Sequence, residues 1–530
     1  MNTTSDPLTA DHATTSVTRV PKPLAGAREW AGLAVLALPT ILLGLDVTLM
    51  YLALPALASD LQPSSTQALW IMDAYGFMIA GFLITMGTLG DRVGRRRLLM
   101  IGAVAFGAAS VLAAYSTSAA MLIAARAALG VAGATLMPST LALISNMFAD
   151  ARQRALAIGV WATMFALGMA AGPVVGGVLL EHFWWGSAFL VAVPVVAILL
   201  VAAPVLLPEY RAPQSGQLDL FSVVLSLAAT LPAIYGLKES AKDGLGTEPI
   251  AALVAGMVFA VWFVHRQRCL ANPLLDMRLF TNRAFSAALL ILLFGLVGVG
   301  GAMLLVTQYL QLVAGLSPLA AGLFMGPPAL AMLVGGIASP LISRRIRPSF
   351  VVAGALALSA TGYFLLAQLD SSGGITLLVA GFSLVYLGLG TIAALGTDLV
   401  VSAAPAPKAG SASAMSEMVQ ELGIAMGVAI LGSLTTALYH YRIADQIPGH
   451  LPNELSRGVS DSLWAASEIA NQLPDGLLVE ARAAFTFGFS IANLASAAVA
   501  IILAILSTVA LRYIGVIGID AHDCSARDVD

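Results

Sequence analysis

Long runs of apolar residues recur along almost the whole chain, and short polar segments separate them. Each run is about 20 residues long, which as an α-helix spans the roughly 30 Å hydrocarbon core of a bilayer. The runs do not alternate polar and apolar residues as the strands of a transmembrane barrel do. The pattern therefore predicts an all-α protein that crosses a membrane many times.

The apolar pattern predicts fourteen spans, arranged as a first half of six, an insert of two and a second half of six. The predicted spans run 31–57, 67–89, 98–116, 119–145, 155–181 and 187–207 in the first half, 218–237 and 249–265 in the insert, and 284–313, 318–342, 349–369, 375–403, 409–438 and 485–514 in the second half.

These spans divide the chain into two bundles, with polar tails at both ends. The expected domains are a disordered cytoplasmic tail (1–30), an N-terminal six-helix bundle (31–207), a linker with the two inserted helices (208–283), a C-terminal six-helix bundle (284–514) and a second cytoplasmic tail (515–530). The longest polar loop, 439–484, carries scattered Leu, Ile and Trp residues, so a short amphipathic helical hairpin or an inert loop is expected there.

Composition and charge support this topology. Only 10% of the 530 residues are charged and 59% are hydrophobic, which leaves too few charges for a soluble surface. Of the 26 Lys and Arg residues, twenty fall in the tails and in the loops on the same side of the membrane, five fall in the opposite loops, and Arg126 lies inside a span. Cytoplasmic loops carry the excess of basic residues, so both termini are expected in the cytoplasm. The net charge of −3 argues against a nucleic-acid partner.

The two halves repeat each other weakly. The loop sequence GDRVGRRRLL (90–99) has a counterpart, ISRRIRPSFV (342–351), in the matching loop of the second half. Three of the four glycines of GMAAGPVVGG (168–177) recur 255 residues later. Parallel repeats of this kind are typical of transporters, which handle substrate near the membrane midplane between the repeats.

Four acids lie within predicted spans, where an uncompensated charge costs several kcal/mol: Asp46, Asp73, Glu417 and Glu421. At 1.5 Å per residue, Asp46 lies about 21 Å and Glu417 about 14 Å from the cytoplasmic ends of their spans, and Asp73 about 9 Å from the opposite end. We expect all four to line one central cavity. The alternative for each is an acid near a helix end, or one that is hydrogen-bonded for packing.

Glu417 and Glu421 share one helical face because they are four residues apart. The corresponding positions of the first half hold Ala162 and Ala166, so the fold itself does not require carboxylates there. Two buried carboxylates this close are difficult to keep ionised together. Such a pair suits a site that exchanges a proton for a cation.

Other residues in the spans fit around these acids. Arg126 is interpreted either as a structural ion-pair partner or as a charge that responds to protonation of nearby acids. Asp398 is interpreted as a possible acid at a helix end. A further set would suit a cavity for lipophilic cations by cation–π contact, although each member also suits packing or a lipid-facing belt: Tyr51, Trp70, Tyr75, Trp161, Met164 and Phe165.

These motifs together resemble the major facilitator superfamily, in its fourteen-span drug:proton antiporter branch. GTLGDRVGRRRLL (87–99) is similar to the loop motif between spans 2 and 3, and IAARAALGVAGA (123–134) to the span-4 motif, in which Arg126 takes the place of the arginine linked to proton coupling. LDVTLMYLALP (45–55), WIMDAYG (70–76) and SEMVQELG (416–423) resemble the acidic motifs of spans 1, 2 and 13.

The resemblance implies roles for further residues. GMAAGPVVGG is similar to the span-5 antiporter motif, whose glycines permit close helix approach. The residues expected to act in conformational gating are Gly87, Asp91, Arg95, Arg96, Gly168, Gly172, Pro173, Gly176 and Gly177. In exporters of quaternary ammonium compounds two acids are adjacent in span 13, whereas here Ser416 precedes Glu417, so the handling of divalent cations is expected to differ.

The resemblance implies a monomeric exporter of lipophilic cations in the cytoplasmic (inner) membrane of a bacterium. Its expected substrates are quaternary ammonium compounds, dyes, biocides and possible fluoroquinolones, and protons drive it without a cofactor or metal. Alternatives are an exporter of one antibiotic or of a lipid, an uptake protein of the same fold, and a membrane sensor. The sequence holds no H-E-x-x-H, P-loop or nucleophile-elbow motif, so an enzyme or an ATP-driven pump is not expected.

Overall fold

The computed structural model describes residues 24–63, 65–211, 219–243, 246–270, 273, 275–370, 374–405, 408–448, 451–474 and 476–515. Of the two predicted tails, only residues 24–30 and 515 fall within these ranges, so the prediction for the remainder lies outside the described residues.

The described residues form helices and no strands. The first half contains α1 (Ala27–Leu61), α2 (Ser65–Val93), α3 (Arg95–Ala114), α4 (Ala119–Met147), α5 (Ala151–His182), α6 (Ser187–Leu190) and α7 (Ala192–Leu206). The insert contains α8 (Leu220–Asp243) and α9 (Thr247–Cys269), followed by the short 3₁₀ helix η1 (Met277–Thr281). The second half contains α10 (Arg283–Gln308), the π-helical turn η2 (Tyr309–Val313), α11 (Pro318–Phe324), α12 (Gly326–Ile342), α13 (Pro348–Ala367), α14 (Ile375–Ser402), α15 (Ala409–Ile443), η4 (Ala444–Gln446), α16 (Asn453–Asp461), α17 (Leu463–Glu468), η5 (Ala470–Gln472) and α18 (Leu477–Ala510).

Thirteen helical stretches among the described residues are long and apolar enough to cross a membrane. They occupy thirteen of the fourteen predicted positions, and α5, with 32 residues, occupies the remaining one. The predicted all-α membrane fold is therefore confirmed.

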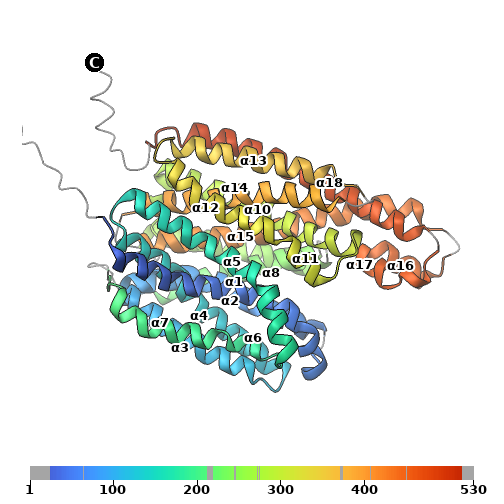
Figure 1. Ribbon diagram of the computed structural model, residues 1–530, viewed down its shortest axis with the longest axis horizontal. Coiled ribbons are helices and arrows are strands. Elements are labelled where there is room, and N and C mark those ends of the chain that lie inside the picture. Colours follow the sequence, from blue (N-terminus) through green and yellow to red (C-terminus); the bar gives the residue numbers. More distant parts are fainter. Residues whose placement is uncertain are drawn as a thin grey trace, which may run out of the picture.

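The two halves are bundles with the same internal packing. In the first, α1 packs on α5, α4 packs on α2 and α3, and α7 packs on α1 and α3. In the second, α10 packs on α15, α14 packs on α12 and α13, and α18 packs on α10 and α13. Figure 1 shows the first bundle in blue to green and the second in yellow-green to red. The weak repeat in the sequence is thus a repeat in structure.

Glycines bring paired helices into backbone contact at equivalent places in both halves. Gly44 of α1 lies against the backbone of α5, and Gly168 of α5 lies against the backbone of α1. Gly427 of α15 likewise lies against the backbone of α10, where Gly301 approaches it. Because a Cβ atom at any of these positions would meet a neighbouring helix, small residues determine how closely each pair packs.

The inserted helices form a pair that contacts both halves. α8 and α9 pack on each other, and Arg266 and Gln267 of α9 bond to Asp219 (2.8 Å) and Ser222 (2.8 Å) at the start of α8. α8 also packs against α2 of the first half and α15 of the second. Its Ser240 carbonyl accepts a hydrogen bond of 3.4 Å from Ser433 of α15.

The long polar segment after α15 folds as a helical hairpin, one of the two alternatives that the sequence left open. α16 and α17 pack together, with Val459, Leu463 and Ala466 buried between them, and the Tyr439 hydroxyl donates to the Val459 carbonyl at 2.7 Å. We call this segment, residues 444–476, the helical hairpin; it projects beyond the bundles in Figure 1. α18 begins at Leu477, before the apolar run predicted from 485, because its first turns are helical although they carry Glu480 and Arg482.

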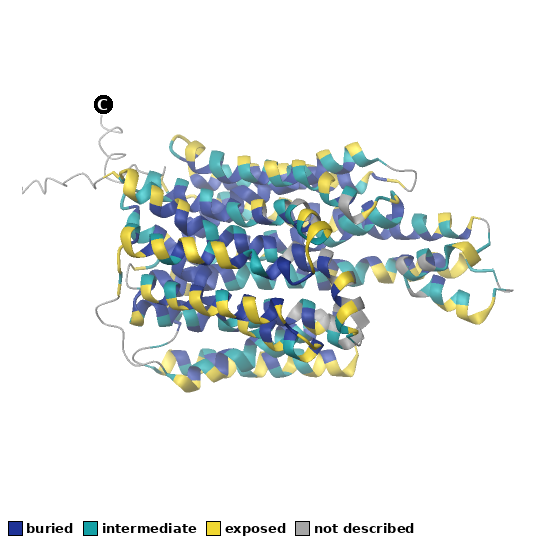
Figure 2. Ribbon diagram, turned by 60° about the horizontal axis from the view of Figure 1, so that its bottom comes forward, coloured by how far each residue is buried: buried dark blue, intermediate teal, exposed yellow. Residues whose placement is uncertain are grey.

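The opposite end of the molecule carries many basic side chains, and we call it the arginine-rich end: Arg92, Arg95, Arg96, Arg97, Arg154, Arg344, Arg345 and Arg347. Buried residues run through the interior of both bundles, and exposed ones line the outer surfaces and the ends (Figure 2). Many exposed side chains along the spans are apolar, as expected for helices that face lipid.

The glycine contact between α1 and α5 yields a stability prediction. We expect Gly168→Ala to lower the melting temperature of the purified protein, because overpacking costs about 1–3 kcal/mol. Gly354→Ala in α13 is the control, since a Cβ there meets nothing within 4 Å and removal of a helical glycine gains about 1 kcal/mol. Thermal unfolding in detergent measures both, and equal melting temperatures would contradict the packing argument.

Candidate functional site

The centre of the first half holds a buried ion pair between two predicted site residues. Arg126 of α4 donates from Nη1 to Oδ2 of Asp46 on α1 at 2.6 Å. The Arg126 side chain is 2% exposed and that of Asp46 13%. Both charges are therefore largely out of water, where each needs the other.

Helix α2 supplies the other contacts of Arg126. Its Nε donates to the carbonyl of Ile71 at 3.0 Å, and its Nη2 donates to the carbonyl of Met72 at 3.5 Å. The ring of Tyr75 lies against the guanidinium, with 4.7 Å from the Arg126 Cζ atom to the ring centroid. Arg126 is thus held by α1, α2 and α4 together, and the sequence did not predict this set of partners.

Tyr75 also connects this group to the second half. Its buried hydroxyl interacts electrostatically with Asp46, with Arg126 and with Glu421 of α15. α2 and α15 pack directly against each other across the contact between the two halves. The structure therefore brings together three of the five predicted coupling residues, and we call Asp46, Tyr75, Arg126 and Glu421 the charge cluster.

Glu417 lies one helical turn from Glu421 on α15, and its side chain is buried. Its Oε1 accepts a hydrogen bond of 3.5 Å from Nε2 of Gln420. The same Nε2 bonds to the Ser416 carbonyl at 3.2 Å. Within the described part of the chain, the ion pairs do not include Glu417. Gln420 was not predicted, although an amide three residues after a buried acid is a signal for such a contact.

The charge cluster lies well inside the membrane-spanning helices. At 1.5 Å per residue, Arg126 is about 10 Å from the first residue of α4, and Glu421 is about 18 Å from the first residue of α15. The bundle centre is therefore where proton and substrate chemistry is expected in a transporter of this architecture.

The predicted cavity-lining residues occupy varied positions. Trp161 is buried and donates from Nε1 to Oγ1 of Thr140 at 3.0 Å, which makes it a packing residue in this conformation. Trp70 is 40% exposed, and Met164 and Phe165 are partly buried. The side chains of Tyr51 and of the predicted acid Asp73 lie outside the described residues.

The arginine-rich end holds a contact between the halves that includes predicted gating residues. Asp91 of α2 pairs with Arg95 of α3, and both are buried. Asp91 also accepts the backbone N–H of Ser411 in the first turn of α15, where a helix N-terminus favours an anion. The Arg95 guanidinium occupies the space that a Cβ atom on Gly410 would need. A Cβ atom on Gly87 would lie only 2.9 Å from the carbonyl oxygen of Gly410, so glycine at both positions permits this contact.

Arg96, another predicted gating residue, acts within the first half. Its Nη1 donates to the carbonyls of Leu207 (3.0 Å) and Pro204 (3.3 Å), and its Nε lies 3.6 Å from Oε2 of Glu209. It thereby ties the start of α3 to the end of α7. Gly168, Gly172 and Gly176 are buried in α5, whereas the side-chain positions of Pro173 and Gly177 lie outside the described residues.

A second contact between the halves involves Asp398, which the sequence suggested was only a possible acid at a helix end. Nε of Arg154, in the first turn of α5, lies 3.3 Å from Oδ1 of Asp398 on α14, and its Nη2 donates to Ser402 at 3.0 Å. Ser402 in turn donates to Asp398 at 3.1 Å. Sequence reasoning missed this pair because its partners are 244 residues apart.

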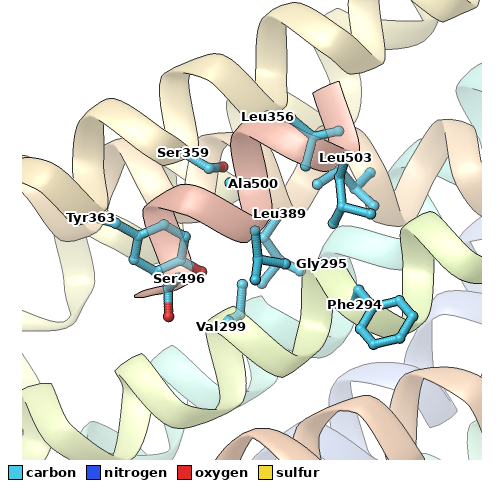
Figure 3. A pocket seen from close by; sticks show the side chains of 13 residues that line it. Phe294, Gly295, Val299, Leu356, Ser359, Tyr363, Leu389, Ser496, Ala500 and Leu503 are labelled. Carbon is cyan, nitrogen blue, oxygen red and sulfur yellow. The ribbon is translucent and has the colours of Figure 1, made fainter. Parts of the chain in front are cut away.

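A small cavity lies elsewhere, inside the second half between α10, α13, α14 and α18 (Figure 3). Ser359, Tyr363 and Ser496 supply polar groups to an otherwise apolar lining. Its water-accessible volume is about 10 Å³, on the order of what one water molecule needs. It is too small for a drug, and none of the predicted site residues lines it.

Comparison with known proteins identifies the family. The profile of the Major Facilitator Superfamily matches residues 36–428 of the chain. The chain belongs to the major facilitator superfamily. It is 42% identical to the multidrug efflux pump LfrA of Mycolicibacterium smegmatis over 512 aligned residues. These residues make up 96% of this chain and 99% of that protein. It is 35% identical over 486 residues to the methyl viologen resistance protein SmvA of Salmonella typhimurium, which covers 90% of this chain and 97% of that protein.

Solved structures agree with this fold. The human organic anion transporter MFSD10 (TETRAN) superposes with a TM-score of 0.57 at 17% identity, over 89% of this chain and 99% of that one. An inward-facing bacterial homologue of the lysosomal transporter Spinster gives 0.54 at 17% identity, over 92% and 98%. In this major facilitator fold, the Arg154–Asp398 pair lies where the two bundles meet, and the charge cluster extends from the centre of the first bundle to α15 of the second.

The Arg154–Asp398 pair yields a second stability prediction. We expect Arg154→Gln to lower the melting temperature, because it leaves the buried Asp398 carboxylate without its cation. Adding Asp398→Asn to this variant should restore part of the lost stability. Thermal unfolding of the two single variants and the double variant measures the coupling energy, which is about 0.5–3 kcal/mol for residues in contact. Additive effects of the two substitutions would show that the pair does not join the halves.

Proposed function

We propose that this transporter exports lipophilic cations in exchange for protons, by alternating access across the cytoplasmic membrane of a bacterium. The observation that carries the proposal is the charge cluster: Asp46 pairs with the buried Arg126, and Tyr75 interacts electrostatically with both and with Glu421 of the other half. Buried Glu417 lies one helical turn from Glu421. Quaternary ammonium compounds, cationic dyes, biocides and fluoroquinolones are the substrates that we propose.

The chemistry follows from the cost of a buried negative charge. A carboxylate in a low-dielectric interior is stable when a proton or another cation neutralises it. A lipophilic cation that reaches Glu417 and Glu421 therefore displaces a proton from this pair, and proton binding on the other side of the membrane displaces the cation. Protonation of Asp46 likewise removes the charge that pairs with Arg126, which links the first half to the same exchange.

The contacts between the halves supply the conformational part of the proposal. We assign the arginine-rich end to the cytoplasm, because most Lys and Arg residues fall in loops at that end. There Asp91 contacts Ser411, and Arg154 contacts Asp398. These contacts join the two bundles, so we assign this conformation to a state closed toward the cytoplasm. Opening to the cytoplasm then requires both contacts to break.

The names of the relatives support export of more than one compound, since LfrA is a multidrug efflux pump and SmvA a methyl viologen resistance protein. A second candidate is an exporter of one antibiotic. It is favoured by 31% identity over 423 residues, 79% of this chain, to the tetracenomycin C resistance and export protein of Streptomyces glaucescens. A panel of unrelated cations and antibiotics, tested for resistance in a pump-deficient host, distinguishes one substrate from many.

The proposed exchange predicts how transport responds to neutralised acids. We expect Asp46→Asn and Glu421→Gln each to lower uphill transport of ethidium in proteoliposomes at least about tenfold, because loss of one buried charge interaction costs more than about 1.4 kcal/mol. Glu454→Gln, an exposed acid in the helical hairpin, is the control. Undiminished transport by both cluster variants would remove these residues from the mechanism.

Proton exchange also predicts the driving force. With the membrane potential clamped by potassium and valinomycin, an acidic lumen should accelerate uptake of tetraphenylphosphonium into proteoliposomes, because protons leave as the cation enters. Nigericin, which dissipates the pH gradient, should abolish the acceleration. Equal uptake with and without the gradient would exclude proton antiport while leaving facilitated transport intact.

A further inference from the structure

Tyr75 occupies a position that its sequence context did not suggest. Its side chain is 5% exposed, and its ring face is covered by the guanidinium of Arg126. The sequence suggested that the face of the Tyr75 ring could bind a substrate cation. In the conformation described, the guanidinium of Arg126 occupies that face. The ring therefore acts on Arg126, and a cation–π contact of this kind is strongest when it is desolvated.

The ring and the two backbone acceptors of α2 hold Arg126 as a unit. The carbonyls of Ile71 and Met72 lie about one helical turn before Tyr75 on the same helix. Together with the ring they fix the guanidinium from the α2 side, while Asp46 binds it from α1. A movement of α2 is thus transmitted to the Asp46–Arg126 pair.

The hydroxyl of Tyr75 lies in different surroundings from its ring. Among the described atoms it is buried and has no hydrogen-bond partner. The charged groups that interact with it are Asp46 from α1, Arg126 from α4 and Glu421 from α15. The other helices packed on α2 are α3 and α8. A buried hydroxyl without a partner is costly, so a group that completes its hydrogen bonding in another conformation is expected.

We propose that Tyr75 is a positioning residue that couples the two halves. Its ring holds Arg126 on Asp46. Its hydroxyl forms a hydrogen bond with the carboxyl group of Glu421 when α2 and α15 move during transport. This inference rests on the proposed proton exchange for its role in transport, but the contact itself does not. A hydroxyl donates to an ionised carboxylate and accepts from a protonated one. The orientation of the Tyr75 hydroxyl, which belongs to the first half, therefore depends on whether Glu421 of the second half is protonated. No proton leaves the tyrosine.

Two substitutions separate the roles of the ring and the hydroxyl. Tyr75→Phe keeps the ring over Arg126 and removes only the hydroxyl, whereas Tyr75→Leu removes both. Tyr363→Phe is the matched control, because Tyr363 is also a buried tyrosine of a spanning helix but lies in the second half, beside the small cavity. Tyr75→Trp is a fourth variant, which keeps an aromatic face without the hydroxyl.

The first test measures the contact and does not depend on transport. We expect a double-mutant cycle of Tyr75→Phe with Glu421→Gln to show non-additive effects on tetraphenylphosphonium binding, by at least about threefold, as is usual for residues in contact. The cycle of Tyr363→Phe with Glu421→Gln should be additive. Additive effects in both cycles would overturn the proposal, whatever the wild-type protein does with protons.

The second test measures the consequence for coupling in proteoliposomes. Tyr75→Phe should lower the tetraphenylphosphonium gradient reached under a fixed pH gradient at least about threefold and shift the pH profile of transport, while counterflow exchange falls by a smaller factor. Tyr75→Leu should impair both modes, since Arg126 loses its aromatic contact. A Tyr75→Phe protein with a wild-type gradient and pH profile would overturn the proposal. A wild-type protein that ignores the pH gradient would instead refute the proton exchange.

Discussion

The structure depends above all on one guanidinium that has been removed from water. A buried arginine is stable only where carboxylate and carbonyl oxygens surround it, because the penalty for an uncompensated buried charge is several kcal/mol. Arg126 meets this need with partners from α1 and α2 while it is itself carried by α4. The contacts of one side chain therefore tie α1, α2 and α4 together at the centre of the first bundle.

The contact between the halves is built differently, from small residues and from charges at one end. Gly87 and Gly410 let α2 approach α15, and Gly159 of α5 similarly lets that helix approach Gly336 of α12. Close backbone approach gives a contact without long side chains that would have to rearrange. At the arginine-rich end, the contacts of Asp91 with Ser411 and of Arg154 with Asp398 add charged links between the halves.

The fold was predictable because the bilayer imposes it. A spanning helix needs about 20 apolar residues, and that requirement is visible in the sequence without knowledge of tertiary contacts. The buried charges were predictable as individual residues for the same reason, since Asp46, Arg126 and Glu417 stand out in apolar runs. Their partners were not: hydropathy does not distinguish a tyrosine that faces substrate from Tyr75, which covers Arg126. Nor does it pair Arg154 with Asp398, because the register between distant helices is determined by packing.

The two inserted helices impose a mechanical condition on any movement of the bundles. α8 touches α2 on one side and α15 on the other, so it cannot travel rigidly with both when they separate. One of these interfaces must slide. The α2 interface includes the apolar contact of Leu231 with Gly81, whereas the α15 interface includes the hydrogen bond from Ser433 to the Ser240 carbonyl. Its neighbour α9 is largely exposed along its length. The helix pair that bridges the two halves is thus the part of the molecule through which the thickness and lateral pressure of the bilayer would act on a movement of the bundles.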